Sequence, residues 1–198
     1  MSQERFKIET SHGDIFIILY EETPLHKANF INLVDSGFFD GSIFHRVIPN
    51  FMIQGGDPNS KNAPPKTRLG NGGPGYTIAA EFRKNLFHKK GALAAARMPD
   101  NVNPKKESSG SQFYIVEGRK WTKDELIKLG DSKGVMFSEK QIEVYTSLGG
   151  YPPLDQNYTV FGEVTDGLSV VNKIINLERD KHNRPLEDVK INITKYYD

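Results

Sequence analysis

Alternating apolar and polar positions predict strands at both ends of the chain. Residues 6–10 alternate, and residues 13–20 do so again after a polar turn at 11–14, so we predict a β-hairpin there. Residues 189–196 alternate in the same way and predict a closing strand. Many short strands separated by turn residues indicate a mainly β fold. Further short strands are predicted at 76–80, 112–116 and 158–164.

Two segments follow a helical period instead. The first helix is predicted to begin at Thr23-Pro24, with Thr23 as N-cap and Pro24 at the first helical position, where no N–H is needed. Gly37 predicts its end. Its expected apolar face consists of Leu25, Ala28, Phe30, Ile31, Leu33 and Val34. The second helix, over 167–177, is expected to bury Leu168, Val171, Ile174 and Ile175.

The stretch 117–153 interrupts the strand pattern. A short helix is predicted to start there at Thr122 or Asp124, and Ser138 predicts the start of a second one. The stretch is too short to bury a core of its own. We therefore interpret it as an inserted helical segment within a single domain that spans 1–198.

The stretch 44–57 combines two short apolar runs with an arginine. Pro49-Asn50 divides the runs and Gly55-Gly56 closes them, which is the pattern of two strands joined by a tight bend. Arg46 stands in the first run among Phe, Val and Ile. An arginine on an apolar sheet surface is costly unless it is paired or has a function. On this stretch alone, a structural arginine paired with a carboxylate is the ordinary interpretation.

Charge and composition exclude several classes of function. The chain has 26 basic and 25 acidic residues and a formal net charge of +1, which argues against broad attraction to nucleic acid or to an anionic membrane. It has no cysteine, so disulfides, thiolate nucleophiles and cysteine-ligated metals are excluded. The N-terminus lacks the apolar core of a signal peptide, and no run is long enough for a membrane span. We expect a cytoplasmic protein.

No cofactor and no metal site are expected. The five histidines lack metal-ligand spacing, and we assign His45, beside Arg46, a structural role. The loop 70–75 satisfies the dinucleotide pattern G-x-G-x-x-G. However, no apolar strand precedes it, no helical pattern follows it, and Pro74 removes an N–H that a phosphate would need. A nucleotide-dependent enzyme would rest on this motif alone.

Three ordered segments carry a resemblance to a known family. The first is 44–57, which contains Phe-His-Arg followed by Phe-Met-Ile-Gln-Gly-Gly-Asp, and the others are 109–115 and 160–164. Together they resemble the cyclophilin family of peptidyl-prolyl cis-trans isomerases over nearly the whole chain apart from the insertion. The resemblance implies a closed antiparallel β-barrel capped by two helices. It also implies a strand at 91–96, where alanine propensity alone favours a helix.

The resemblance further implies the residues of a site. Arg46 would be the catalytic residue, and Gln54 would bind the substrate and hold Arg46 in place. The main chain at Ala96-Arg97 would pair with the substrate, with Gln112 beside it. An apolar cup for the proline ring would be formed by Phe51, Met52, Phe113 or Tyr114, and Leu154.

Three departures from the family pattern bear on ligand choice. Tyr158 stands where the family often has a pocket histidine, and Arg97 stands where it often has asparagine. Pro153 occupies the position of a family tryptophan associated with cyclosporin binding. Trp121, at the other edge of the insertion, either reaches the same pocket rim or the tryptophan is lost. We therefore expect weak cyclosporin sensitivity.

Prolyl isomerisation fits a chain without nucleophile, metal or cofactor, because no bond is made or cut. The barrier of about 18–20 kcal/mol is that of amide resonance, and a guanidinium aimed at the proline nitrogen stabilises the twisted amide more than the planar one. We expect an isomerase, a folding helper or chaperone, that acts on X-Pro bonds of folding or flexible polypeptides. The insertion offers a place for a protein partner. The alternative is a proline-peptide binding module of a larger assembly with incidental turnover, but a pure binder has no need of Arg46.

Overall fold

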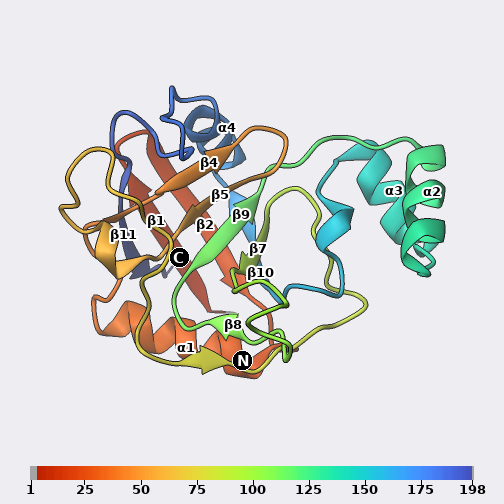
Figure 1. Ribbon diagram of the computed structural model, residues 1–198, viewed down its shortest axis with the longest axis horizontal. Coiled ribbons are helices and arrows are strands. Elements are labelled where there is room, and N and C mark those ends of the chain that lie inside the picture. The colour runs from red at the N-terminus through yellow and green to blue at the C-terminus, as the bar shows by residue number, and fades with distance from the viewer. Residues whose placement is uncertain (1–3, 198) are drawn as a thin grey trace.

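A nine-stranded antiparallel sheet organises the computed structural model, which describes residues 4–197 (Figure 1). Its strand order is β3-β11-β1-β2-β10-β7-β9-β5-β4. In chain order the strands are β1 (Arg5–Thr10), β2 (Gly13–Leu19), β3 (Ser42–Ile43), β4 (Arg46–Ile48), β5 (Met52–Gly55), β7 (Ala92–Ala95), β9 (Phe113–Val116), β10 (Val160–Asp166) and β11 (Lys190–Lys195). A separate two-stranded sheet pairs β6 (Thr77–Ile78) with β8 (Ser108–Ser109). The predicted mainly β fold is confirmed.

The sheet curls without closing, so the expectation of a closed barrel is wrong in this respect. β3 and β4 are its two edges, and within residues 4–197 no ladder joins them. Each edge bonds to a segment outside the sheet: the N–H of Ile43 in β3 donates to Ser60 Oγ at 3.1 Å, and the N–H of Val47 in β4 donates to the carbonyl of Asn183 at 2.8 Å. A loop therefore takes the bonds that a closing strand would have made.

Two helices cover opposite ends of the curled sheet, and both contribute side chains to the same core. α1 (Pro24–Asp35) lies at one end and α4 (Leu168–Ile175) at the other, whereas α2 (Lys123–Lys133) and α3 (Glu139–Ser147) lie to one side of the curled sheet (Figure 1). Two short 3₁₀ turns, η1 (Pro58–Ser60) and η2 (Pro152–Leu154), complete the set. No helix in the described part of the chain is both long and apolar enough to cross a membrane.

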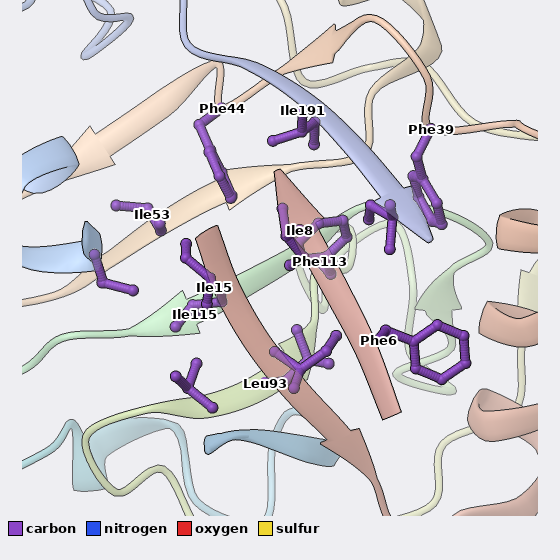
Figure 2. Close-up of a cluster of buried hydrophobic side chains, with 14 of the residues drawn as sticks. Phe6, Ile8, Ile15, Phe39, Phe44, Ile53, Leu93, Phe113, Ile115 and Ile191 are labelled. Atoms are coloured by element: carbon purple, nitrogen blue, oxygen red, sulfur yellow. The ribbon is translucent and has the colours of Figure 1, made fainter. Parts of the chain in front are cut away.

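The two faces of the sheet carry different apolar clusters. Side chains alternate across a strand, so Ile53, Phe113 and Ile115 point into the main core, where Figure 2 shows them with Ile8 and Leu93. Their sequence neighbours point the other way. We call this second set, on the opposite face, the outer cluster; its buried members are Met52, Ala92, Ala94, Tyr114, Val116 and Val160.

Helix α1 is capped from a distant part of the chain. Thr23 occupies the N-cap position, but its side chain makes no cap hydrogen bond. The carboxylate of Glu81 instead accepts from the N–H groups of Leu25 and His26, at 3.2 and 3.0 Å. The expected apolar face is also partly wrong, because Leu25 is 52% exposed and His26 is buried. The His26 ring fits inside because it contacts Glu81 at 2.7 Å and Ser108 at 2.8 Å.

The alanine-rich segment forms a strand, β7, as the family pattern implied, and not the helix that alanine propensity favours. Ala92–Ala95 form a strand between β10 and β9, and all four residues are buried. Burial between two partner strands therefore overrides the weak preference of alanine for a helix.

The insertion consists of two capped helices joined to the barrel at one place. Thr122 caps α2 and Ser138 caps α3, each in a reciprocal capping box with the residue three positions on. The helices pack around Phe87, Leu126 and Tyr145. Where the insertion leaves the barrel and where it returns, isolated bridges join Gly150 to Lys89 and Arg119. A Cβ on Gly150 would lie 2.3 Å from the carbonyl oxygen of His88, so only glycine fits this crossing.

Candidate active site

A line of polar side chains crosses the outer face of the sheet. Arg46 and Gln54 face each other across the β4–β5 ladder, and the guanidinium Nη1 donates to Gln54 Oε1 at 3.2 Å. Gln54 Nε2 then donates to Gln112 Oε1 at 3.0 Å, and Gln112 Nε2 donates to the carbonyl of Gly72 at 2.7 Å. This sequence of donors and acceptors fixes both amide orientations. Arg46 is therefore held in place by a chain that ends on a main-chain group.

Arg46 is a half-buried cation with apolar surroundings. Its guanidinium carbon lies 6.0 Å from the centre of the Phe51 ring. Burial lowers the pKa of Arg46 from its usual value, while Tyr158 acts in the opposite direction. An arginine stays protonated at neutral pH under such conditions. On its own stretch of sequence, Arg46 was expected to pair with a carboxylate. In the structure its guanidinium donates instead to the amide oxygen of Gln54.

The outer cluster lies beside this cation. Met52 and Tyr114 are its buried floor, and Phe51, Leu154 and Tyr158 pack against them as partly buried residues. These five residues, which we call the cup, were all candidates from the sequence. They come from the β4–β5 turn, β5, β9, η2 and the loop after η2, so chain segments far apart in the sequence supply one apolar surface.

Phe113 does not join the cup. It lies in the main core among aromatic rings, with ring centres 5.9 Å from Phe30 and 5.6 Å from Phe39. The alternative of Phe113 or Tyr114 therefore resolves to Tyr114, because successive residues of a strand point to opposite faces. Phe113 helps the site only by fixing the strand that carries Tyr114 and Gln112.

The main-chain groups of Ala96 are already bonded within the protein. The N–H of Ala96 already donates to the carbonyl of Gln112 at 3.0 Å, and its carbonyl accepts from Ser109 at 2.8 Å. A substrate strand is therefore expected to pair with the main chain of Arg97. The Arg97 side chain does not project into solvent: it is 4% exposed, and its guanidinium carbon lies 4.4 Å from the centre of the Tyr158 ring.

Arg97 also separates the cup from a neighbouring cavity. Its Nε donates to the carbonyl of Asn157 at 2.8 Å, and its Nη1 donates to Asp100 at 2.6 Å, so it joins the loops on either side. Beyond it lies a cavity of about 630 Å³ lined in part by Gly72, Ala96, Met98 and Gln112. The glycine loop 70–75 forms one wall of this cavity, and β6 rather than a helix follows the loop, which removes the structural basis of the nucleotide interpretation.

Sequence reasoning missed Tyr151, and it left open whether Trp121 reaches the rim of the pocket. The Tyr151 ring packs on Phe51, with ring centres 4.3 Å apart, and only its position next to Pro152 could have suggested this. Trp121 lies in the insertion, packs with the cluster around Tyr145, and donates its Nε1–H to the carbonyl of Gly150 at 3.1 Å. It belongs to a different cluster from the cup.

His45 is buried behind the site. It is 4% exposed, and neither ring nitrogen has a hydrogen-bond partner among residues 4–197. Burial lowers the pKa of His45 to about 4; Asp57 favours the charged form, whereas Arg46 and Arg184 oppose it. No group of three or more metal-ligand side chains is found in the described part of the chain.

Comparison with known proteins gives one consistent result. The sequence model of the family described as "Cyclophilin type peptidyl-prolyl cis-trans isomerase/CLD" matches residues 5–196. A Staphylococcus aureus (strain USA300) protein named as a peptidyl-prolyl cis-trans isomerase is 36% identical over 188 residues, which cover 93% of this chain and 87% of that protein. A Streptococcus pyogenes protein named as a bifunctional phosphatase/peptidyl-prolyl cis-trans isomerase is 37% identical over 199 residues, which cover 96% of this chain but only 38% of that protein.

Solved structures agree with the sequence comparison. The crystal structure of a Cryptosporidium parvum cyclophilin type peptidyl-prolyl cis-trans isomerase superimposes with a TM-score of 0.74 at 25% identity, covering 100% of this chain and 99% of that one. A second crystal structure of that protein, obtained in the presence of the dipeptide Ala-Pro, gives a TM-score of 0.72 at 26% identity, covering 98% of this chain and 99% of that one.

Proposed function

The chain belongs to the cyclophilin-type peptidyl-prolyl cis-trans isomerases, and on that premise we propose that Arg46 is its catalytic residue. The substrate is an X-Pro bond in a folding or flexible polypeptide. The cup of Phe51, Met52, Tyr114, Leu154 and Tyr158 receives the proline ring. The dipeptide Ala-Pro present with the Cryptosporidium protein supports this class of ligand.

The proposed mechanism is electrostatic. As the amide twists, its nitrogen loses resonance and regains a lone pair, which the Arg46 guanidinium binds. This bond is stronger in the twisted state than in the planar one, and only such a difference accelerates the reaction. A hydrogen bond to a charged group is worth about 1.5–3 kcal/mol, and each 1.36 kcal/mol is tenfold in rate. Arg46 alone therefore accounts for about one to two decades.

The observation that carries this proposal is the hydrogen bond from Arg46 to Gln54 beside the cup. The test is a protease-coupled assay on an Ala-Pro tetrapeptide with the wild type, Arg46→Ala and Arg46→Lys. We expect kcat/KM to fall at least tenfold in Arg46→Ala. The fall should be smaller in Arg46→Lys, which keeps a positive charge but loses the planar donor geometry. Equal rates for Arg46→Ala and the wild type would demote the enzyme to a proline-peptide binding module.

We also propose that long substrates contact the insertion. A cavity of about 770 Å³, which we call the insertion groove, lies between the α2–α3 link and the turn after η2; it is lined in part by Lys84, Lys133, Val135, Met136, Phe137 and Gln156. Met136 is 95% exposed. The lining holds two lysines and one carboxylate, Asp155, which already accepts from Tyr145, so the lysines favour a negatively charged occupant. A substrate segment with a large apolar side chain next to a carboxylate matches both properties.

Cytoplasmic location, folding clients and the single-domain organisation stay predictions from the sequence. The name of the Streptococcus protein also includes a phosphatase, but this chain covers only 38% of that protein. We therefore propose no phosphatase activity for this chain.

A further inference from the structure

A chain of four side chains, three buried and one (Asp155) with 9% of its side chain exposed, connects the insertion to the cup. Tyr145 of α3 donates its hydroxyl to Asp155 Oδ2 at 2.7 Å. Asp155 Oδ1 lies 2.9 Å from His88 Nδ1, and His88 Nε2 lies 2.9 Å from the hydroxyl of Tyr114. His88 and Tyr145 are completely buried, and Tyr114 is 4% exposed. The chain therefore runs through the interior of the protein from the insertion to the floor of the cup.

The proton positions in this chain follow from its two ends. Burial raises the pKa of both Tyr114 and Tyr145 above the usual tyrosine range, so both hydroxyls carry a proton. Asp155 accepts from Tyr145 and also from the main-chain N–H of His88, at 2.9 Å. Because both oxygens of Asp155 act as acceptors, the Nδ1–H of His88 donates to Asp155 Oδ1, which leaves His88 Nε2 to accept from the hydroxyl of Tyr114. Each hydrogen bond has one donor and one acceptor, and the arrangement needs no net positive charge on His88.

Two parts of the cup depend directly on this chain. Tyr114 is its last member. Asp155 follows Leu154 in sequence, and its N–H donates to the carbonyl of Pro152 at 3.1 Å, which closes the turn η2. The carbonyl of His88 also accepts from the N–H of Tyr151 at 2.8 Å. The position of Asp155 and His88 therefore fixes the floor of the cup at Tyr114 and one wall at Leu154.

We propose that Tyr145 is a positioning residue for proline recognition, acting through Asp155 and His88 on Leu154 and Tyr114. The inserted helices thus complete the cup from behind, in addition to any contact with long substrates. A well-packed tyrosine at this place would need only its ring to stabilise α3. The hydroxyl adds a second role, because it donates to Asp155, the residue that ends the η2 turn. This inference rests on the proposed function, because it assigns the cup to the proline ring.

The test is the variant Tyr145→Phe, which keeps the ring and removes the hydroxyl. We expect KM for an Ala-Pro tetrapeptide to rise three- to tenfold while kcat changes less than twofold, since Arg46 is untouched. Trp121→Phe is the matched control: it also removes one hydrogen bond from an aromatic residue of the insertion, a partly buried one that donates to Gly150 at 3.1 Å, but that bond does not lead to Asp155. Its KM is expected to equal that of the wild type.

A second variant distinguishes a connected chain from general loosening. His88→Asn keeps a donor near Asp155 but no longer reaches Tyr114. If the chain acts as one unit, His88→Asn raises KM as Tyr145→Phe does, and the double variant raises it no further. Additive effects in the double variant, or an unchanged KM in a folded Tyr145→Phe, would overturn the proposal.

Binding is measured together with turnover so that the two proposals fail separately. Chemical-shift titration with the same tetrapeptide gives Kd without turnover. A wild type that binds the peptide but does not isomerise it would contradict the proposed function, and Kd of Tyr145→Phe would still test the positioning role. The ¹⁵N shifts of His88 give an independent readout: a wild-type His88 without the Nδ1–H tautomer would contradict the proton positions, and with them the proposed chain.

Discussion

Gln54 holds Arg46 by its amide oxygen and not by a charge. The distance from Arg46 Nη1 to Gln54 Oε1 is 3.2 Å, and the amide nitrogen of Gln54 is engaged by Gln112. A carboxylate at this place would bind the guanidinium more tightly, but it would also neutralise the charge that the twisted amide needs. An amide positions the cation and leaves its charge available.

The first prediction separates positioning from charge at Gln54. Gln54→Ala removes the acceptor and should lower kcat/KM about tenfold, because one hydrogen bond to a charged group is lost. Gln54→Glu keeps an acceptor and adds a negative charge, so we expect kcat to fall although Arg46 stays in place. Both variants are assayed on the Ala-Pro tetrapeptide. A Gln54→Glu enzyme with wild-type kcat would show that the free charge of Arg46 does not matter.

The second prediction concerns the distant cap of α1. Glu81→Gln replaces one of the oxygens that accept from Leu25 and His26, and it should lower the free energy of unfolding by about 2 kcal/mol, because buried donors lose their partner. Thr23→Val should cost less, because the Thr23 side chain makes no cap bond. Urea denaturation at pH 7 measures both. The reverse order would mean that Thr23 is the effective cap.

The third prediction is that the protein loses stability at acidic pH because of His45. Its pKa is about 4 in the folded state and about 6.5 in an unfolded chain. Between these values the unfolded state binds more protons, so stability falls as the pH drops from about 6.5 to about 4. The loss over the whole window is about 3 kcal/mol.

His45→Leu isolates this contribution. The variant has no proton to bind and leaves no unpaired ring nitrogen, so its unfolding free energy should fall less than that of the wild type between pH 7 and pH 4.5. The pKa of His26 is also lowered, mainly by burial, and His26 gives both proteins the same background. Equal pH dependence in the two proteins would show that His45 does not contribute.

The fourth prediction tests the insertion groove. The double variant Lys84→Glu, Met136→Asp should lower the ratio of kcat/KM for a long acidic and apolar peptide to kcat/KM for the tetrapeptide about fivefold. The reason is that the variant places like charges opposite the substrate and removes an exposed apolar contact. Lys128→Glu on α2 changes an exposed charge outside the groove lining and serves as the control. An unchanged ratio in the double variant would restrict substrate recognition to the cup.

Local signals in the sequence predicted those elements whose cause is local. Thr122 and Ser138 each precede a partner three residues on, and both form the capping boxes that start α2 and α3. The alternative start at Asp124 is thereby excluded. The hairpin of β1 and β2 follows in the same way from alternation and a polar turn.

Features that depend on long-range contacts could not be predicted. Glu81 caps α1 from 55 residues away in sequence, and no local pattern carries that information. Alternation along β9 shows that Phe113 and Tyr114 point to opposite faces, but not which of them shares a face with Met52. That choice depends on the register between β9 and β5, which the sequence does not give. The Gly72 carbonyl that anchors Gln112 belongs to an irregular loop, and its direction follows from backbone angles that side-chain patterns do not encode.

The crossing at Gly150 makes the inserted segment exchangeable. Because the bridges to Arg119 and Lys89 hold its two ends side by side, the ends stay joined whatever lies between them, and the entropy of closing a loop grows only slowly with its length. Evolution or a protein engineer could therefore swap residues 120–148 for a shorter or longer piece without rebuilding the barrel. A replacement segment would need its own hydroxyl that donates to Asp155, as Tyr145 does in this chain. Asp155 therefore sets the one requirement that any replacement must meet.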